Sequence, residues 1–256
     1  MSELRNIYKI ISNKKVCPRF YHLKIEAPKL VKNVRPGQFI HIRVRDSVEP
    51  FFRRPFCVYR AQDSIDILYE VVGKGTALLS AKKKNDQLDI LGPLGNTFSM
   101  PPEGVQTVVM IAGGIGVAPF LFLTDQLKTR PVHLILLYGG RTKEHIFSLA
   151  PFKKNGCKIY TATDDGSVGV RGRVSELFFH VPKDSRGTWI YTCGPKPMMA
   201  SAQQFAQEHQ INGEASCEEV MACGLGACLG CATKTKEGYK TVCYDGPVFD
   251  LNELVF

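Results

Sequence analysis

The sequence predicts three consecutive parts: an antiparallel β-barrel at residues 1–100, an α/β domain with a doubly wound parallel sheet at residues 101–215, and a small C-terminal domain at residues 216–256. Three observations indicate this order. Apolar and polar residues alternate in short runs of the first part, whereas short apolar runs alternate with helical segments in the second. The third part holds five of the nine cysteines. At 256 residues, the chain is long enough for two domains with cores and a small appendage.

The first part has the pattern of half-buried strands. Residues 21–27, 40–44 and 65–71 each alternate apolar with polar side chains, and glycine, proline or asparagine bounds the runs. Short strands of this kind predict a small antiparallel barrel. None of the six histidines has a Cys, Asp or His partner at ligand spacing. We therefore interpret all six, His41 among them, as surface residues or as core residues with satisfied hydrogen bonds.

Two motifs of the barrel have the chemistry of a flavin dinucleotide site. Arg54, in Arg54-Pro55-Phe56-Cys57, offers a cation for a pyrophosphate, and Phe56 or Tyr59 offers a flat contact for a ring. Gly75-Thr76 opens a short helix, whose free amides suit further phosphate oxygens. Taken singly, the first motif is typical of an edge strand and the second of a helix cap. Their order and spacing together predict bound FAD.

The second part begins with a buried strand and a glycine-rich turn. Residues 107–112 form the strand, and Gly113-Gly114-Ile115-Gly116 then leads into a helix with Pro119 in its first turn. Such a turn lets the backbone approach a pyrophosphate at the helix start. Further strands at residues 133–138, 157–163 and 188–192 indicate a parallel sheet, with ligand bound at the carboxyl ends of its strands.

Four cysteines near the C-terminus have the spacing of cluster ligands. Four residues separate Cys223 from Cys228, two separate Cys228 from Cys231, and eleven separate Cys231 from Cys243. This spacing is close to the plant-type ferredoxin pattern and predicts a 2Fe-2S cluster. Zinc is the alternative for four thiolates, although zinc sites usually present two short cysteine pairs. Cys217 lies outside the pattern.

The flavin motifs resemble those of ferredoxin-NADP reductase-like proteins, in which Arg-x-x-Ser or Arg-x-x-Thr precedes a Gly-x-x-Thr-like phosphate turn. Arg54 and Cys57 fall on the first motif, where Cys57 replaces the usual hydroxyl with a weaker donor. The resemblance also implies that the strand before the phosphate turn lines the flavin ribityl and phosphate groups. That strand supplies Tyr69, Glu70 and Val71, and Glu70 stands where related sequences often have a basic residue.

The fourth strand of the second part ends in Cys193-Gly194-Pro195. This resembles the Cys-Gly-Pro motif that the same family places beside the nicotinamide, which implies a catalytic role for Cys193 and cofactor contacts for Gly194 and Pro195. A small buried thiol is the alternative for Cys193. Arg141 follows the second strand near a possible 2′-phosphate position, so the sequence leaves open whether NAD or NADP binds.

Composition and charge narrow the class of protein. Apolar residues make up 44% of the chain and charged residues 22%, as in soluble globular proteins. The N-terminus lacks the apolar core of a signal peptide, and the longest apolar run is too short and glycine-rich to span a bilayer, so we expect a cytoplasmic protein without a membrane span. The net charge is +9, but the basic residues are scattered without interleaved aromatics, which argues against nucleic-acid binding.

The whole chain resembles the family of electron-transfer subunits of NAD-linked dihydroorotate dehydrogenases. The resemblance depends on the Arg54-Pro55 motif, the Met221-Ala222-Cys223-Gly224 loop and the Asp245-Gly246-Pro247-Val248-Phe249 ending. It implies FAD, a 2Fe-2S cluster and NAD, and an FMN-containing catalytic partner in a heterotetramer of two plus two subunits. In that family electrons pass from dihydroorotate through the partner, the cluster and FAD to NAD, within pyrimidine biosynthesis.

Two alternatives remain at this point. The chain could be the flavin and iron-sulfur subunit of another multi-subunit oxidoreductase, such as a hydrogenase or an NAD(P)H-ferredoxin reductase. A zinc-stapled binding module with no redox role is an alternative of a different class.

Overall fold

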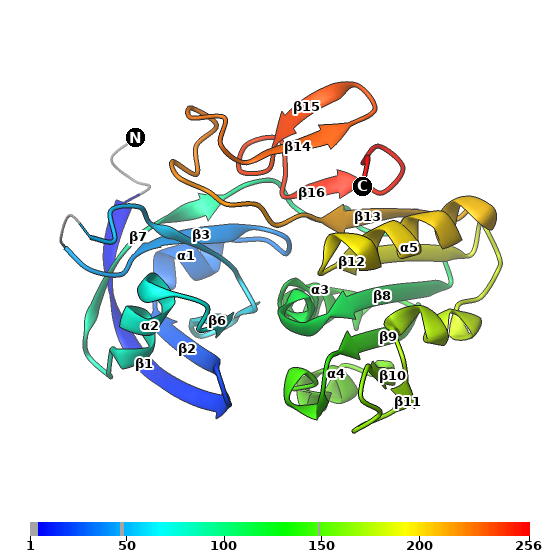
Figure 1. The fold of residues 1–256 in the computed structure, drawn as a ribbon, viewed down its shortest axis with the longest axis horizontal. Helices are drawn as coiled ribbons and strands as arrows, with labels where there is room; N and C mark the ends of the chain where they lie inside the picture. The colour runs from blue at the N-terminus through cyan, green and yellow to red at the C-terminus, as the bar shows by residue number, and fades with distance from the viewer. Residues whose placement is uncertain (1–4, 47–48, 148) are drawn as a thin grey trace.

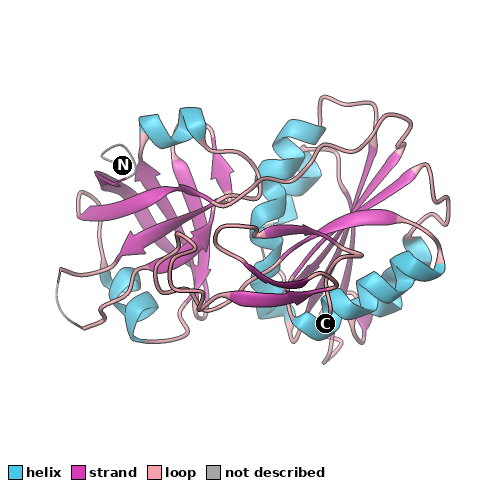
Figure 2. Cartoon of the chain, turned by 90° about the horizontal axis from the view of Figure 1, so that it is seen from above, coloured by secondary structure: helices cyan, strands magenta, loops and turns pink. Residues whose placement is uncertain are grey.

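The computed structural model describes residues 5–46, 49–147 and 149–256. Two sheets lie side by side, and the C-terminal segment lies over the junction between them (Figures 1 and 2). Within the described residues, no helix is both long and apolar enough to cross a bilayer.

The first sheet forms the predicted barrel. In the described residues it has seven antiparallel strands in the order β4-β3-β7-β1-β2-β6-β5. In chain order these are β1 (Arg5–Cys17), β2 (Phe20–Glu26), β3 (Phe39–Arg43), β4 (Arg54–Cys57), β5 (Arg60–Ala61), β6 (Ile65–Glu70) and β7 (Gln87–Leu94). The helices are α1 (Pro28–Asn33) and α2 (Lys74–Ala81). Most of the alternating apolar positions, including Leu23, Ile40 and Ile67, are fully buried inside the barrel, as their period predicts, and Tyr21 and Val71 are partly buried.

The second sheet is parallel except at one edge. Its described strands have the order β11-β10-β9-β8-β12-β13-β16, and only β16 pairs in the antiparallel direction. They are β8 (Thr107–Gly113), β9 (His133–Gly140), β10 (Lys158–Thr163), β11 (Val170–Arg171), β12 (Thr188–Cys193), β13 (Asn212–Ser216) and β16 (Val248–Asp250). From β8 the chain adds β9, β10 and β11 on one side, and it then returns to add β12 and β13 on the other side, so the strand order reverses between β8 and β12. In doubly wound sheets, ligands bind at the carboxyl ends of the strands at such a reversal.

Helices cover both faces of this sheet. Phe120 and Phe152, from α3 (Ala118–Leu127) and α4 (Leu149–Lys154), pack on one face. Leu177 and Ala202, from η3 (Val174–His180) and α5 (Lys196–Glu208), pack on the other. Two short 3₁₀ helices, η1 (Gly114–Val117) and η2 (Lys143–His145), follow β8 and β9. The predicted doubly wound architecture is confirmed.

The C-terminal segment joins both halves of the molecule. After β13 it forms the cysteine loop and a hairpin of β14 (Ala232–Thr235) and β15 (Gly238–Thr241), and β16 then returns to the second sheet. The Asn96 side chain donates to the carbonyls of Asp245 (3.0 Å) and Val248 (2.7 Å) and accepts from the Val248 amide (2.9 Å). These bonds fasten the C-terminal ending to the chain that leaves the barrel. The C-terminal segment also supplies β16 to the second sheet, so it is not separate from that sheet. The domain boundary at residue 216 stays a prediction.

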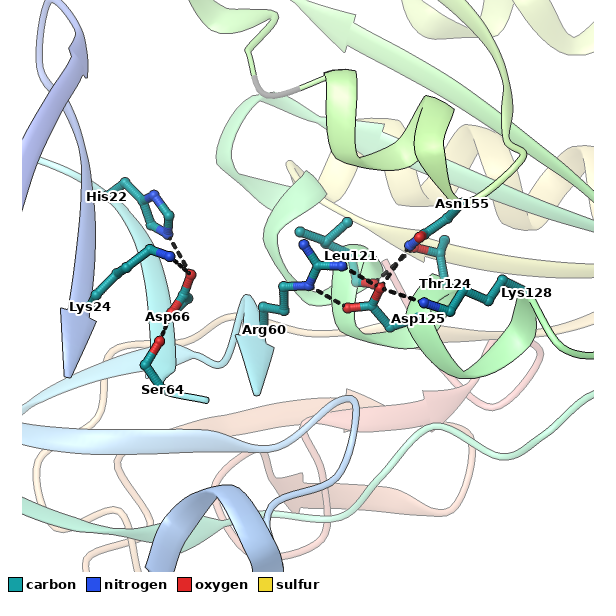
Figure 3. Close-up of polar contacts among 10 residues, drawn as sticks. All are labelled: His22, Lys24, Arg60, Ser64, Asp66, Leu121, Thr124, Asp125, Lys128 and Asn155. Carbon is teal, nitrogen blue, oxygen red and sulfur yellow. Dashed lines mark hydrogen bonds and ion pairs between the residues drawn. The ribbon is translucent and has the colours of Figure 1, made fainter. Parts of the chain in front are cut away.

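A bidentate ion pair links the barrel to the second domain. Arg60 of β5 donates to both carboxylate oxygens of Asp125 on α3, at 2.6 and 2.7 Å (Figure 3). Asn155 donates to the same carboxylate at 2.9 Å, and Lys128 lies 3.8 Å from it. Phe122, also on α3, packs into the barrel core. Polar and apolar contacts therefore both hold the two halves in one arrangement.

Candidate functional site

A cavity of about 380 Å³ lies where the barrel, the start of α3 and the C-terminal segment meet. The predicted flavin residues that line it are Arg54, Pro55, Phe56, Cys57, Tyr69, Glu70, Gly75 and Thr76. Val71 is not among the lining residues and packs against the barrel core instead. Tyr59, the alternative to Phe56 as a flat contact, is buried in the other core and also does not line the cavity. The structure thus brings most of the predicted barrel residues to one place.

One end of the cavity is suited to an anion. A Cβ atom built on Gly75 would lie 2.5 Å from Nε of Arg54, so a glycine is needed for the guanidinium to lie against the start of α2. The Thr76 hydroxyl accepts from the amides of Val72 (2.9 Å) and Gly73 (3.2 Å), which caps the helix. A guanidinium beside the free amides of a helix start is a favourable position for phosphate oxygens.

The carboxylate of Glu218 acts on two thiols, that of Cys57 in the cavity wall and that of Cys193 behind it. Burial, and then the nearby Glu218, raise the pKa of the Cys57 thiol well above its ordinary value. Burial likewise raises the pKa of the fully buried Cys193 thiol, with Glu218 again the second cause. Both groups are therefore neutral thiols rather than reactive thiolates. Cys193 ends β12 but does not itself line the cavity.

Glu218 is a cavity residue that the sequence analysis missed. Its side chain is accessible from the cavity, although the protein around it desolvates the carboxyl and raises its pKa. No motif distinguishes this glutamate from its neighbours in the sequence, and only the fold brings it to Cys57. A carboxyl with a raised pKa in a cavity is a common feature of functional sites.

The predicted nucleotide residues lie at the reversal between β8 and β12. A Cβ on Gly113 would lie 2.8 Å from Pro195, and a Cβ on Gly116 would lie 2.4 Å from the carbonyl oxygen of Cys193. Gly194 has a φ of +148°, and a Cβ on it would lie 3.0 Å from the amide nitrogen of Gly113. Close packing of the two turns therefore explains these glycines. Gly114, with a φ of +54° and open space around it, is the one whose backbone a ligand can approach.

The cysteine loop turns its backbone amides toward sulfur. The Gly226 amide donates to Sγ of Cys243 at 3.1 Å, and the Leu225 amide donates to Sγ of Cys223 at 3.4 Å. The Cys243 amide donates to Sγ of Cys231 at 3.4 Å. Burial raises the pKa of the Cys223 thiol, but amide donors, first that of Leu225, outweigh it and lower the pKa to about 7. The loop therefore stabilises the thiolate of Cys223, the form that binds metal, whereas burial raises the pKa of the Cys243 thiol to about 12.

The four predicted ligands come together as two pairs. The side chains of Cys223 and Cys228 interact with each other, and so do those of Cys231 and Cys243; the charge of Cys223 also acts on Cys243, which links the two pairs. In the part of the chain that the structure describes, no three His, Cys, Asp or Glu side chains converge on a position for one metal ion. Amide donors aimed at sulfur, and glycines 224 and 226 at positive φ, fit the tight loop that an iron-sulfur cluster needs.

His41 departs from the sequence interpretation. It is fully buried, and neither ring nitrogen makes a hydrogen bond of regular geometry among the described residues. A Cβ built on Gly224 would lie 2.5 Å from its Nδ1, so the ring packs directly against the cysteine loop. Burial, followed by the charge of Arg53, lowers the pKa of the imidazole to about 4, although the Cys223 backbone raises it. The interpretation as a surface residue or a satisfied core residue is wrong for His41.

Comparisons with known proteins match every part of this architecture. Residues 110–204 match the family model described as an oxidoreductase NAD-binding domain. Residues 218–255 match the iron-sulfur cluster binding domain of dihydroorotate dehydrogenase B. A solved structure of an NADH-dependent reduced ferredoxin-NADP oxidoreductase aligns with a TM-score of 0.86 and 28% identity, over 98% of this chain and 90% of that one. A ferredoxin NADP+ reductase from Neisseria gonorrhoeae shares the fold, with a TM-score of 0.70, 19% identity, and coverage of 83% and 98%.

Two curated relatives cover nearly the whole chain, and both are named dihydroorotate dehydrogenase B (NAD(+)), electron transfer subunit. The protein from Desulforamulus reducens is 36% identical over 97% of each chain. The protein from Bacillus caldolyticus is 38% identical over 96% of each chain. The resemblance inferred from the motifs is confirmed: the chain belongs to the family of electron transfer subunits of NAD(+)-dependent dihydroorotate dehydrogenase B.

Proposed function

We propose that this chain carries electrons from a dihydroorotate-oxidising catalytic subunit to NAD, in the pyrimidine pathway that the family serves. The observation that supports this most directly is the path of the C-terminal segment. Cys217, Glu218, Glu219 and Met221 line the cavity, and Cys223 begins the cysteine loop two residues later. The flavin site and the cluster site therefore share one short stretch of chain.

The predicted residues that the geometry favours fall into three groups in this proposal. Arg54 and the start of α2 hold the pyrophosphate of FAD, while Phe56 and Cys57 border its ring. Gly114 and the start of α3 hold the nicotinamide dinucleotide, with Cys193 beside the nicotinamide as a neutral thiol. Cys223, Cys228, Cys231 and Cys243 hold the 2Fe-2S cluster. A bound flavin supplies the chemistry that exchanges hydride with a nicotinamide and single electrons with iron.

The cysteine loop also carries an apolar surface for the partner. Four large apolar side chains around the ligands have half or more of their surface exposed: Val220, Leu225, Leu229 and Tyr244. Exposed apolar residues gathered at one place are typical of protein interaction sites. We assign this surface to the catalytic subunit, which carries FMN in a two-plus-two heterotetramer. Electrons then enter the chain at the cluster, the part nearest the partner.

Replacing Cys228 by Ser tests the relay, because Cys228 is exposed and its loss disturbs the core least. We expect the variant to lose its iron, to retain FAD and NADH-dependent dye reduction, and to lose dihydroorotate-dependent NAD reduction with the catalytic subunit. Cys17→Ser, on β1 away from the cysteine loop, is the matched control and keeps all activities. A variant without iron but with FAD that still couples dihydroorotate to NAD at the control rate contradicts the relay.

The same experiment separates the alternatives. A zinc-stapled module has no flavin or iron-sulfur absorption in its visible spectrum, and its cysteine variants change no redox activity. A subunit of another oxidoreductase accepts electrons from a different partner, so dihydroorotate fails as the donor even with the wild-type chain.

A further inference from the structure

A buried histidine lies between the flavin strand and the cysteine loop. His41 belongs to β3, where it pairs with Pro55 of β4, the strand that carries the Arg54-Pro55-Phe56-Cys57 motif. Ile40 and Ile42 point into the barrel, so His41 and Phe39 point to the opposite side of the strand. The C-terminal segment covers that side, and Phe39 packs in the same core as Cys231 and Cys243.

The imidazole meets the cysteine loop directly beside its first ligand. The Nδ1 and Cε1 edge faces Gly224: a Cβ on that glycine would lie 2.5 Å from Nδ1 and 2.7 Å from Cε1. Burial lowers the pKa of the imidazole, and a hydrogen-bond contact with the Cys223 backbone raises it. On the same side of β3 the ring stands edge-on to Phe39, with centroids 6.0 Å apart. The His41 side chain therefore contacts the backbone of the cysteine loop on one side and the Phe39 ring on another.

A neutral imidazole has one N–H donor and one acceptor nitrogen. Within the described residues neither nitrogen of His41 makes a hydrogen bond of regular geometry, although the side chain is fully buried, and the Cys223 backbone is the polar group that contacts the ring. Leaving such a group unsatisfied is unfavourable, so a buried donor of this kind calls for a functional or structural reason. Leucine or phenylalanine would fill the same space without that cost, and the neighbouring positions of β3 are apolar.

We propose that His41 is a positioning residue for the iron-sulfur cluster, whose ring N–H holds the Cys223–Gly224 peptide and thereby orients the first ligand. This inference rests on the proposed function for the presence of the cluster. The histidine fastens the first cluster ligand to the strand next to the flavin motif. The N–H dipole also points positive charge toward the loop. Hydrogen bonds and dipoles around cluster sulfurs are known to set the reduction potential, and a donor favours the reduced state.

The test compares two substitutions in the full-length protein with FAD and cluster. His41→Leu removes both nitrogens, whereas His41→Asn keeps an amide N–H near the position of Nδ1. His133→Leu, at an exposed position at the start of β9, is the control for loss of a histidine. The readouts are iron and sulfide content, the electron paramagnetic resonance spectrum of the reduced cluster, and its midpoint potential.

We expect His41→Leu to favour the oxidised cluster about tenfold more than the wild type, a fall of about 59 mV for a one-electron couple. His41→Asn restores most of that shift, and His133→Leu causes none. If His41→Leu also loses the cluster, the result for His41→Asn decides between the outcomes. A His41→Asn variant that retains the cluster, with a midpoint potential near the wild-type value, supports the proposal. Equal loss or equal shift in both variants, or no shift in either, overturns it. Wild-type protein without iron and sulfide would instead contradict the proposed function.

Discussion

Arg60→Ala tests whether the ion pair between the barrel and α3 determines the arrangement of the two halves. The guanidinium donates twice to Asp125, and the exposed fractions of the two side chains are 23% and 8%. Breaking a buried ion pair by removing one partner costs about 3–5 kcal/mol. Arg60 is partly exposed, and Asp125 keeps Asn155 at 2.9 Å and Lys128 at 3.8 Å. We therefore expect the free energy of unfolding to fall by about 2 kcal/mol, below that range.

Urea unfolding of the FAD-loaded protein measures this loss, and a double-mutant cycle with Asp125→Asn isolates the pair. Arg43→Ala is the matched control, since Arg43 lies on a barrel strand and pairs with the almost fully exposed Asp46. Exposed pairs of that kind contribute about 0–1 kcal/mol. NADH-dependent dye reduction should also fall in Arg60→Ala, because hydride transfer needs the flavin site of the barrel and the nucleotide site of the second domain in a fixed relative position.

The reasoning about Arg60 is refuted if Arg60→Ala and Arg43→Ala lose the same stability. It is also refuted if the cycle gives no coupling between Arg60 and Asp125. If Arg60→Ala loses much stability but keeps its dye reduction, the ion pair stabilises the fold and does not determine how the two sites are arranged.

Two further predictions concern the cofactor sites. Arg54→Ala should weaken FAD binding roughly 10- to 100-fold, because a hydrogen bond to a charged group contributes about 1.5–3 kcal/mol; FAD retained after gel filtration at the level of Arg43→Ala would contradict this. Gly224→Ala should reduce iron content, because its φ of +71° is unfavourable for alanine and the new Cβ would meet Nδ1 of His41 at 2.5 Å. Gly238→Ala is the control for positive φ without a clash, since nothing lies within 4 Å of its Cβ position, and equal iron loss in both variants would rule out the contact with His41 as the cause.

Local patterns in the sequence predicted the parts of the molecule that depend on local physics. Alternating residues gave the barrel strands because one face of each strand is buried, and glycine turns after buried strands gave the parallel sheet. The cysteine spacing identified the cluster loop because three ligands on one short loop need a fixed number of intervening residues. These predictions need no knowledge of which parts of the chain meet in space.

Contacts between distant segments explain what the sequence analysis missed. His41 has the period of a polar, outward-facing position, and it does face outward from the barrel, but the C-terminal segment covers that side of β3. Glu218 reaches the cavity for the same reason, because the segment after β13 passes beside β4. Gly113 and Gly116 match a nucleotide turn, yet packing against the Cys193-Gly194 turn accounts for both.

The C-terminal segment couples the flavin cavity to the cluster site through its covalent structure. Met221 lines the cavity and Cys223 is the first predicted ligand, so only two peptide units separate them. Their Cα atoms are therefore at most about 7–8 Å apart. A change that releases the cysteine loop at Cys223 loosens the cavity wall at Met221. The Cys217 amide, by contrast, still donates to the Pro247 carbonyl (2.8 Å), and Glu219 stays paired with Lys196 (2.5 Å). FAD content must therefore be measured in every cysteine variant, and Cys223→Ser should lower it more than Cys243→Ser, whose ligand lies twenty residues further along the chain.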